Sequence, residues 1–421
     1  MNVPRERRRY SLPRFYRLDS RDGFAKCRNF EENYRILNAD GSLDECHRVE
    51  LTGGLDREIA YRDVPRDREA NVLCFDSNGY LGFQHHSSVK RAAIEAIETF
   101  GAGTPSVPLL GGTNALGRSA ERKLAEFHGR EDAILFSSAF AANVSLVGAL
   151  VRDCDVIVHD EGVHASTLAG IRLAEPRRTL TFRTNDLGDL EAKLRLANEG
   201  RGEGDIFVFA EGVYSMEGAT LDLAGVRGLC ASHDAKLIVD ECHSIGVLGA
   251  SGRGIEEAAG LPGSIDLIVG CASKALGLLG GYIVGSADVT RYLRYLSSAY
   301  VFSTTLPPPV CAGIIAGLEL IDREPEHLKR LHANVARMRD GFARLGLPTP
   351  APGSAIFKIV IPDNRALFET GSRLLRAGLK CGVVTYPAVK EGHGILRLVV
   401  TARHSGADVD RAVEVLASVL E

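Results

Sequence analysis

In Leu237-Ile238-Val239-Asp240-Glu241-Cys242-His243-Ser244, an apolar run turns polar at its carboxyl end. A short apolar run of this kind is typical of a strand buried on both faces of a parallel sheet. Four more runs share the pattern: Ala133 to Phe136, Val156 to Val158, Ile206 to Ala210 and Leu267 to Val269. Amphipathic stretches typical of helices lie between them, such as Val89 to Phe100, Ser119 to Phe127, Leu187 to Ala197 and Leu223 to His233. This alternation predicts an α/β fold with a mostly parallel sheet.

The 421 residues exceed what one hydrophobic core usually supports, so we expect more than one domain. Residues 1–70 are polar and irregular, which predicts an N-terminal arm with limited structure of its own. Residues 71–309 carry the strand–helix alternation and form the predicted large domain. A break at Leu306-Pro307-Pro308-Pro309 then precedes the predicted smaller α+β domain, residues 310–421. Its expected elements are helices from Val310 to Arg323, Glu326 to Leu345 and Ala407 to Glu421, and strands from Ile356 to Ile361 and Ile395 to Val400.

Composition excludes several classes of partner. The formal net charge of −4 provides no strong positive field for nucleic acid or an anionic membrane. The basic cluster from Arg5 to Arg9 is typical of a solvated chain end. No apolar stretch has the length of a membrane span or the position of a signal peptide, which predicts a cytoplasmic protein. The nine cysteines are scattered without a metal-ligand spacing, so we expect no metal.

Lys274 lies in an unusual place for a solvated lysine. The stretch Gly270-Cys271-Ala272-Ser273-Lys274-Ala275-Leu276-Gly277 sets it between an apolar run and a glycine-rich run that ends in Gly280-Gly281-Tyr282. A lysine that holds pyridoxal 5′-phosphate (PLP) as a Schiff base needs a desolvated site that lowers its pKa, so that the free amine attacks an aldehyde. The alternative on this stretch alone is an ordinary loop lysine.

Asp240 is placed to assist such a lysine. It ends an apolar run at the carboxyl edge of a predicted strand, where open α/β sheets bind their ligands. A carboxylate there can hold a pyridinium N–H and so keep a PLP ring electron-withdrawing. The stretch from Asp240 to Lys274 is long enough for one helix and one strand, which would put both residues on neighbouring strand ends, with His243 close by. The alternative is a polar strand end with a solvated histidine.

Three further stretches follow predicted strands. Small residues around Ser138, Ala139 and Phe140 open a predicted helix and offer backbone N–H groups to a phosphate. His164, in Asp160-Glu161-Gly162-Val163-His164-Ala165-Ser166, could stack on a flat ring. Ser215 could reach a phenolic oxygen. Taken singly, these are also readable as a tight turn, a structural histidine and a polar loop.

Ten stretches, in chain order, resemble the α-oxoamine synthases. That family of PLP-dependent enzymes includes serine palmitoyltransferase, 8-amino-7-oxononanoate synthase, 2-amino-3-ketobutyrate CoA ligase and 5-aminolevulinate synthase. Each stretch is weak alone, but ten in register, from about Asn78 to the C-terminus, are specific. They are Asn78-Gly79-Tyr80-Leu81-Gly82, Phe140-Ala141-Ala142-Asn143, His164-Ala165-Ser166, Asn185-Asp186, Glu211-Gly212-Val213-Tyr214-Ser215-Met216, Val239-Asp240-Glu241-Cys242-His243, Gly252-Arg253-Gly254, Ser273-Lys274, Phe302-Ser303-Thr304-Thr305-Leu306-Pro307-Pro308 and Leu396-Arg397-Leu398.

The resemblance implies a fold-type I PLP-dependent transferase, with the large domain binding PLP, and it implies roles for the candidate residues. Lys274 would form the Schiff base and later move protons at the substrate α-carbon, with Asp240 on the pyridine nitrogen and His164 stacked on the ring. The other implied roles are ring-hydroxyl contact by His243 and Ser215, phosphate binding by Ser138, Ala139, Phe140 and Cys271, carboxylate binding by Arg397 with Asn78, and contact of Ser303 and Thr304 with the phosphate of the neighbouring subunit. That last contact implies an obligate homodimer with shared active sites.

The implied reaction is a decarboxylative Claisen-type condensation. A small L-amino acid (serine, alanine or glycine) would lose its α-proton, attack an acyl thioester and lose carbon dioxide to give an α-amino ketone. His164 could also polarise the thioester carbonyl as negative charge develops on it.

Four positions depart from the family pattern. Cys271 stands where a threonine usually touches the phosphate, and a thiol is a weaker donor. Ala139 replaces a glycine of the phosphate-binding turn, and Gly117 replaces a common histidine. The loop from Gly101 to Gly111 has Pro108 where the family has an arginine, and its two prolines remove N–H donors from the acyl pocket. The altered acyl side predicts an unusual donor, including the hypothesis of an acyl carrier protein in place of coenzyme A.

Two alternatives to this function remain. One is another fold-type I PLP enzyme, such as an aminotransferase or a lyase. The other is a non-catalytic partner subunit of a serine palmitoyltransferase-like complex, which would be expected to lack the lysine present here as Lys274. The N-terminal extension, residues 1–70, and the motifs around Asp240 and Ser215 slightly favour the serine palmitoyltransferase-like members.

Overall fold

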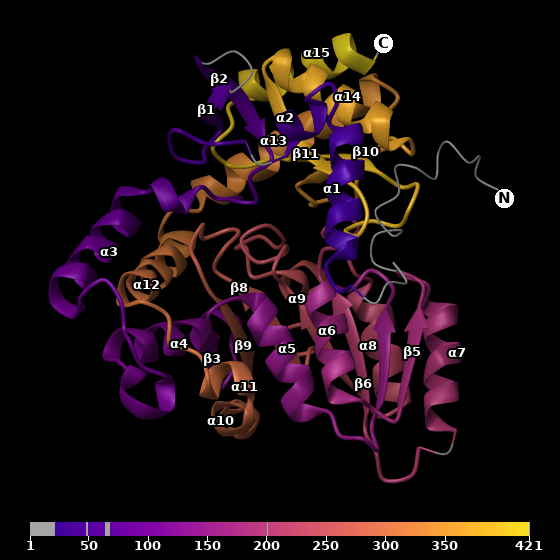
Figure 1. The fold of residues 1–421 in the computed structure, drawn as a ribbon. Helices are drawn as coiled ribbons and strands as arrows, with labels where there is room; N and C mark the ends of the chain where they lie inside the picture. The colour runs from indigo at the N-terminus through magenta and orange to yellow at the C-terminus, as the bar shows by residue number, and fades with distance from the viewer. Residues whose placement is uncertain (1–21, 48, 64–67, 200, 421) are drawn as a thin grey trace.

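The computed structural model describes residues 22–47, 49–63, 68–199 and 201–420, and the Arg5 to Arg9 cluster lies outside them. Its larger sheet has seven strands in the order β3-β9-β8-β7-β6-β4-β5 (Figure 1). They are β3 (Asp132–Phe136), β4 (Val156–Asp160), β5 (Arg178–Phe182), β6 (Ile206–Glu211), β7 (Ala235–Asp240), β8 (Leu267–Cys271) and β9 (Gly281–Gly285). The pairs from β8 to β5 are parallel, and β9 is antiparallel to both its neighbours. The five predicted strands and the mostly parallel sheet are confirmed.

Two strands of this sheet escaped prediction. β5 lies at the edge of the sheet, and most of its side chains are exposed or half-buried, so it lacks an apolar run. β9 is fully buried but is bounded by glycines within the glycine-rich run after Lys274, which hides the strand pattern.

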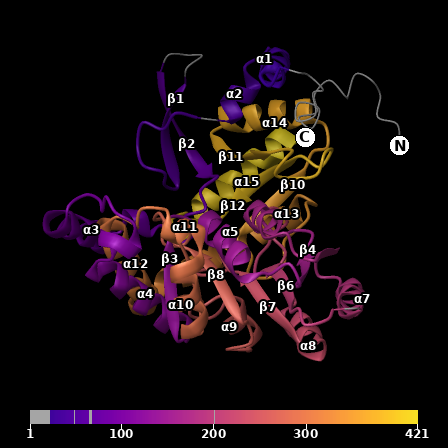
Figure 2. The same ribbon diagram turned by 60° about the horizontal axis from the view of Figure 1, so that its bottom comes forward.

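Alternate residues of the central strands enter two separate cores. In β7 and β8, Leu237, Val239 and Ile268 belong to one apolar cluster, while Ile238 and Val269 belong to another. Successive side chains of a strand point to opposite faces, so the apolar runs supply both faces of the sheet. Helices cover each face, with α5, α6 and α10 on one side and α4, α7 and α8 on the other (Figures 1 and 2).

The four predicted helices of this part are confirmed within a few residues at each end. All helical segments and short turns of the described residues are α1 (Ala25–Leu37), α2 (Ser42–Cys46), η4 (Phe83–His85), α3 (Ser87–Phe100), η5 (Pro108–Gly112), α4 (Ala115–His128), α5 (Ala139–Leu150), α6 (Ala165–Ala174), α7 (Leu187–Asn198), α8 (Leu223–Ser232), α9 (Ile255–Ala259), α10 (Ala287–Leu296), α11 (Ser298–Val301), α12 (Pro308–Arg323), α13 (Glu326–Arg344), α14 (Asn364–Arg376) and α15 (Gly406–Leu420). Within the part of the chain that the structure describes, no helix combines the length and hydropathy that crossing a bilayer requires.

The smaller sheet joins both ends of the chain. Its order is β1-β2-β11-β12-β10, formed by β1 (Glu58–Asp63), β2 (Arg68–Phe75), β10 (Ile356–Val360), β11 (Leu379–Val384) and β12 (Ile395–Val399). β2 pairs in parallel with β11. The expectation of an N-terminal arm with limited structure is therefore wrong for its described part, which contributes two helices and a strand. The sequence pattern did not show this strand because it depends on tertiary pairing: β1 pairs with β2, and β2 pairs with β11 near the opposite end of the chain.

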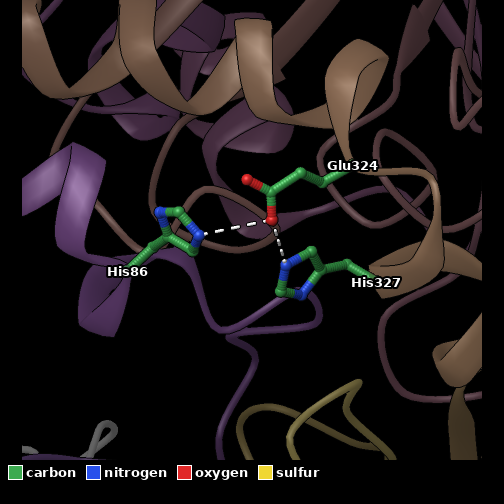
Figure 3. Close-up of side chains that lie close together, drawn as sticks. All are labelled: His86, Glu324 and His327. Carbon is green, nitrogen blue, oxygen red and sulfur yellow. Dashed lines mark hydrogen bonds and ion pairs between the residues drawn. The ribbon is translucent and has the colours of Figure 1, made fainter.

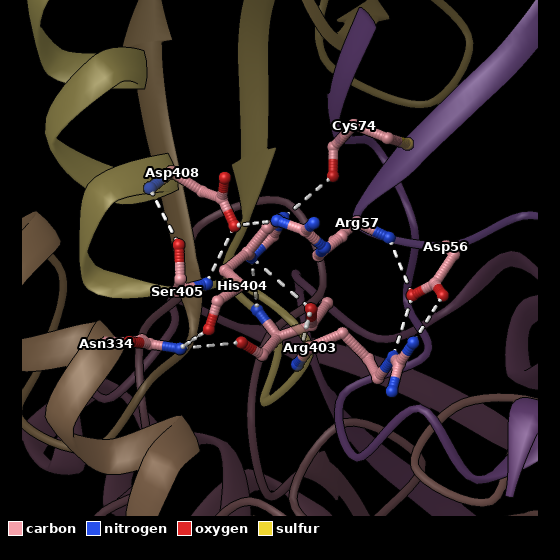
Figure 4. A network of polar contacts seen from close by, with 9 residues as sticks. Asp56, Arg57, Cys74, Asn334, Arg403, His404, Ser405 and Asp408 are labelled. Carbon is pink, nitrogen blue, oxygen red and sulfur yellow. Dashed lines mark hydrogen bonds and ion pairs between the residues drawn. The ribbon is translucent and has the colours of Figure 1, made fainter. Parts of the chain in front are cut away.

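A polar network fastens this N-terminal segment to the loop before α15 (Figure 4). Arg403 donates to both carboxylate oxygens of Asp56, at 2.9 and 2.7 Å, and Arg57 pairs with Asp408 at 2.7 Å. Between the two ion pairs, His404 contacts the carbonyl oxygen of Cys74 at 3.0 Å. The ion pairs are partly exposed and contribute little each, but together with the buried histidine they fix the register of the segment that leads to Asn78.

Candidate functional site

The carboxyl ends of the parallel strands gather the predicted site residues at one edge of the larger sheet. His164 follows β4, Ser215 follows β6, His243 follows β7 and Lys274 follows β8. The register pairs Glu211 with Asp240 and Asp240 with Val269, so these strand ends lie level with one another. Arg397 enters from β12 of the smaller sheet, which makes the site a junction of the two sheets.

Lys274 lies near polar groups at the carboxyl ends of the strands. Burial lowers the pKa of its amine, but four neighbouring groups outweigh burial and raise it above its ordinary value: Cys242, Cys271, Asp240 and Tyr80. The lowered pKa expected from desolvation alone is therefore not found for these side chains. The interaction with Asp240 agrees with the positions of the two residues at the ends of the neighbouring strands β7 and β8.

Two donors orient the Asp240 carboxylate. Asn143 Nδ2 donates to Asp240 Oδ2 at 2.8 Å, and the backbone N–H of Cys242 donates to Oδ1 at 2.9 Å. Asn143 lies on α5, whose first turn contains the predicted phosphate-binding residues, so one helix serves both parts of the site. A carboxylate held this way is fixed for a cationic N–H partner.

His164 stands at the N-terminus of α6 in one fixed tautomer. Its Nδ1 accepts from the backbone N–H of Ser166 at 3.2 Å and lies 2.7 Å from the Ser166 hydroxyl, so Nε2 carries the proton. Partial burial and the charge of Lys274 lower the pKa of His164, which makes the ring neutral at neutral pH. The edge of Phe140 meets this ring, with centroids 6.4 Å apart and planes at 84°.

Arg397 is buried and held by backbone and side-chain acceptors. Its Nε donates to the carbonyl oxygen of Ser215 at 2.8 Å, and its Nη1 donates to Asn78 Oδ1 at 3.1 Å. These contacts place Asn78 beside Arg397 and fix the plane of the guanidinium. An oriented guanidinium is suited to a carboxylate ligand.

The turn from Ser138 to Phe140 begins α5. Ser138 is the N-cap, and its hydroxyl accepts from the N–H of Ala141 at 3.1 Å. The N–H groups of Ala139 and Phe140 have no intrahelical acceptor by helix geometry, so they face outward for an anion. Gly281 of β9 passes so close that an added Cβ would lie 2.2 Å from the nitrogen of Ala139. This close approach requires glycine and presses the turn against the site.

The Cys271 thiol points toward protein instead of toward this turn. Its Sγ lies 3.8 Å from the carbonyl oxygen of Cys242, and both side chains are buried. The sulfur is thus directed at a neighbouring strand end.

Thr304, which follows Ser303 in the chain, lies near the loop that departs from the family pattern. Thr304 and this loop line one hollow of about 580 Å³ together with Ser137, the residue before the phosphate-binding turn. Its lining is Gly103, Thr104, Pro105, Ser137, Leu279, Thr304, Thr305, Leu306 and Pro307. Pro108 is buried in the short turn η5, whose last N–H, from Gly112, donates to the carbonyl oxygen of Val107.

Three polar groups of the site received no role from the sequence. Asn143 braces Asp240, as described above. Glu211 is buried and accepts from the N–H of Ser215 at 3.3 Å, and its Oε1 has no partner among the described residues. Burial, together with the charge of Asp240, raises the pKa of Glu211 well above its ordinary value. Tyr80 contacts His243. All three residues lie in stretches that carry the family resemblance, so the sequence marked their positions. It did not indicate where their side chains point.

A second cluster, His86, Glu324 and His327, has the composition of a metal site but the wrong proton positions (Figure 3). His86 Nδ1 accepts from the N–H of Ser88 at 3.2 Å, and Arg330 donates to His327 Nδ1 at 3.0 Å. Each Nε2 therefore carries the proton and donates toward Glu324, at 3.4 and 3.1 Å. A ligating nitrogen needs a free lone pair, so the cluster is a hydrogen-bonded brace between α3 and α13.

The residues present fit PLP. The site combines a lysine amine, an oriented carboxylate for a ring N–H, a neutral imidazole at the neighbouring strand end and free helix N–H groups for a phosphate. The buried Oε1 of Glu211, opposite Asp240 in the strand register, has no partner among the described residues and could serve a polar group of the cofactor.

Comparisons with known proteins agree with this fit. The family described as aminotransferase class I and II matches residues 70–416. An 8-amino-7-oxononanoate synthase of Bacillus velezensis is 36% identical over 348 residues, which cover 83% of this chain and 88% of the relative. A 4-hydroxy-2,2'-bipyrrole-5-methanol synthase of Serratia sp. is also 36% identical, over 85% of this chain and 54% of the relative. The structure of a serine palmitoyltransferase from S. paucimobilis with bound PLP superposes with a TM-score of 0.88 at 28% identity, covering 95% of this chain and 98% of that one.

Proposed function

Because the chain belongs to the aminotransferase class I and II family, and within it to the α-oxoamine synthases, we propose that it condenses a small L-amino acid with an acyl thioester and releases carbon dioxide. It is a PLP-dependent enzyme of fold type I. One observation carries the proposal: Lys274, the candidate cofactor lysine, follows β8 at the same sheet edge at which Arg397, the candidate carboxylate ligand, donates to the carbonyl oxygen of Ser215 after β6. Two relatives that are equally similar to this chain are named for different products, so membership of the family does not identify the substrate.

In this proposal the strand-end residues hold and tune the cofactor. When bound, PLP supplies an electron sink for negative charge at the substrate α-carbon. Asp240 holds a proton at the pyridine nitrogen, and the two donors on its oxygens keep it aimed there. His164 covers one ring face, while the helix N–H groups of Ala139 and Phe140 bind the phosphate, next to Ser138. His243 and Ser215 contact the ring hydroxyl.

Lys274 would act as the base that takes the proton from the substrate α-carbon. A positioned amine contributes by taking the α-proton and returning a proton after carbon dioxide leaves. His164 donates from Nε2 toward the thioester carbonyl oxygen as charge develops there, which its neutral, fixed tautomer supports. Cys271 contributes little to phosphate binding in this account, because its thiol is directed at Cys242.

Arg397 binds the amino-acid carboxylate. We expect Arg397→Lys to raise the KM for the amino acid by about 10²-fold, since an ammonium keeps the charge but loses one charge-assisted hydrogen bond of the fork. Steady-state kinetics at saturating thioester measures this, with the visible spectrum as a control that the cofactor remains bound. An unchanged KM would remove Arg397 from the carboxylate site.

A homodimer with shared sites is part of the proposal. Phe302 and Leu110 are 83% and 82% exposed, respectively, and both lie next to segments that line the hollow beside the phosphate turn. Large apolar side chains this exposed mark an interaction surface. Burying them against a second copy would bring Ser303 and Thr304 to the partner's phosphate. We also propose a cytoplasmic location.

The acyl donor is proposed to differ from the family's usual coenzyme A thioester. The loop from Gly103 to Pro105 faces the hollow without a basic side chain, and Pro108 is buried in its turn. A nucleotide with several phosphates finds no cationic partner in this lining, whereas a carrier protein presents its acyl chain on a narrow arm. Both donors therefore belong in the test.

The test is a product assay on the purified holoenzyme. Glycine, alanine and serine are each incubated with matched acyl-CoA and acyl carrier protein thioesters, and mass spectrometry searches for the α-amino ketone. We expect ketone from one amino acid, with faster turnover of the carrier thioester. Equal turnover of both donors would overturn the carrier proposal, and ketone from neither would overturn the proposed reaction.

A further inference from the structure

Tyr80 makes a short hydrogen bond inside the site that the proposed roles do not use. Its Oη lies 2.7 Å from Nδ1 of His243, and its side chain is completely buried. Tyr80 precedes η4 in the loop after β2, and its carbonyl oxygen accepts from the N–H of Ala402 at 2.7 Å. The tyrosine is thus anchored by the same loop that the Figure 4 network fastens.

The direction of this hydrogen bond follows from the chemistry of the two groups. A phenol O–H is the stronger donor of the pair and a neutral imidazole nitrogen the stronger acceptor, so the Tyr80 hydroxyl donates to His243 Nδ1. Burial raises the pKa of Tyr80, which keeps the phenol protonated. Burial, with the charges of Lys274 and Arg397, lowers the pKa of His243 well below its ordinary value, which keeps the imidazole neutral with one lone pair.

We propose that Tyr80 is a positioning residue that fixes His243 in the tautomer with its proton on Nε2. The Tyr80 O–H donates to His243 Nδ1, which leaves the histidine proton on Nε2. The Nε2 proton is then the one available to donate to the phenolic oxygen of PLP. This inference rests on the proposed cofactor site and adds a residue that sets the proton position of His243.

Other charged groups face the same pair and share any pH response. Those that act on His243 are Lys274, Arg397 and His164, and those that act on Tyr80 are Arg397, Lys274 and Cys271. None of them is removed by a change at Tyr80. A substitution there that removes a single atom thus isolates the hydrogen bond between Tyr80 and His243.

The test is the pH titration of the visible absorption band of the holoenzyme, without substrate. A donor on the phenolic oxygen stabilises its negative charge most when the neighbouring imine nitrogen is unprotonated, so it lowers the pH midpoint of the band. Tyr80→Phe removes only the hydroxyl, and we expect the midpoint to rise by about one pH unit, the size of one hydrogen bond to a charged group. A midpoint that stays in place or falls would overturn the inference.

Tyr282→Phe is the matched control, because Tyr282 is also buried and its Oη lies 3.2 Å from His128 Nε2. Its midpoint is expected to equal the wild-type value. In a His243→Ala background, Tyr80→Phe should add no further shift, and a full additional shift would show that Tyr80 acts by another route. If the wild-type holoenzyme shows no band that depends on Lys274, the proposed site fails. If the band is present and only the Tyr80 effect is missing, the positioning role of Tyr80 is wrong and the proposed cofactor site stands.

Discussion

The Lys274→Ala variant will lack the visible absorption band of the holoenzyme and will form ketone at least about 10³-fold more slowly than wild type. The substitution removes both the covalent attachment of the cofactor and the amine that moves the α-proton, and a positioned acid–base group alone contributes up to about 10⁴-fold. Absorption spectroscopy and single-turnover kinetics measure the two losses separately.

Lys236→Ala is the matched control for this variant. Lys236 is an exposed lysine near the start of β7, far along the strand from the site. It should keep both the band and the rate. A Lys274→Ala enzyme that retains the band would exclude Lys274 as the attachment point and would end the account of the site given above.

The Asp240→Asn variant is expected to bind PLP but to lose about 10³-fold or more in kcat. The amide cannot hold a proton on the pyridine nitrogen, so the ring no longer withdraws electrons from the α-carbon. The fold should survive, because an amide oxygen still accepts one of the donors from Asn143 and Cys242 that hold the carboxylate. The readouts are kcat and the rate of exchange of the amino-acid α-proton with solvent, which should fall together.

Asp266→Asn serves as its control. Asp266 lies at the opposite end of the β7–β8 pair, where Oδ2 accepts from the N–H of Leu237 at 2.7 Å. It removes the same charge from the same strands without touching the site. If Asp240→Asn kept wild-type α-proton exchange, the proposed role of Asp240 would be wrong.

The sequence predicted the strand ends of the site because two signals coincide there. Apolar runs locate buried strands, and a polar residue directly after such a run lies at the sheet edge. Asp240, His243 and Lys274 were found in this way, and the structure brings them together. Arg397 could not be placed by this logic, because it belongs to a different sheet, and only the resemblance to a family assigned it.

The misses have a common physical origin in long-range pairing. β1 and β2 form strands because β11, near the other end of the chain, offers β2 a partner. The hydrogen bond between Tyr80 and His243 likewise joins residues that are 163 positions apart in the chain. Local sequence patterns carry no information on such pairs. A pKa also depends on residues distant in the chain: burial predicted a lowered pKa for Lys274, while the neighbouring groups raise it.

The most direct test of the proposed condensation is the fate of the amino-acid carboxyl carbon. The holoenzyme is incubated with a carboxyl-labelled amino acid, with and without the acyl thioester, and labelled carbon dioxide and ketone are counted. The account predicts one carbon dioxide per ketone, both strictly dependent on the thioester and both absent in Lys274→Ala. Transfer of the amino group to a keto acid, with the carboxyl label retained, would contradict it.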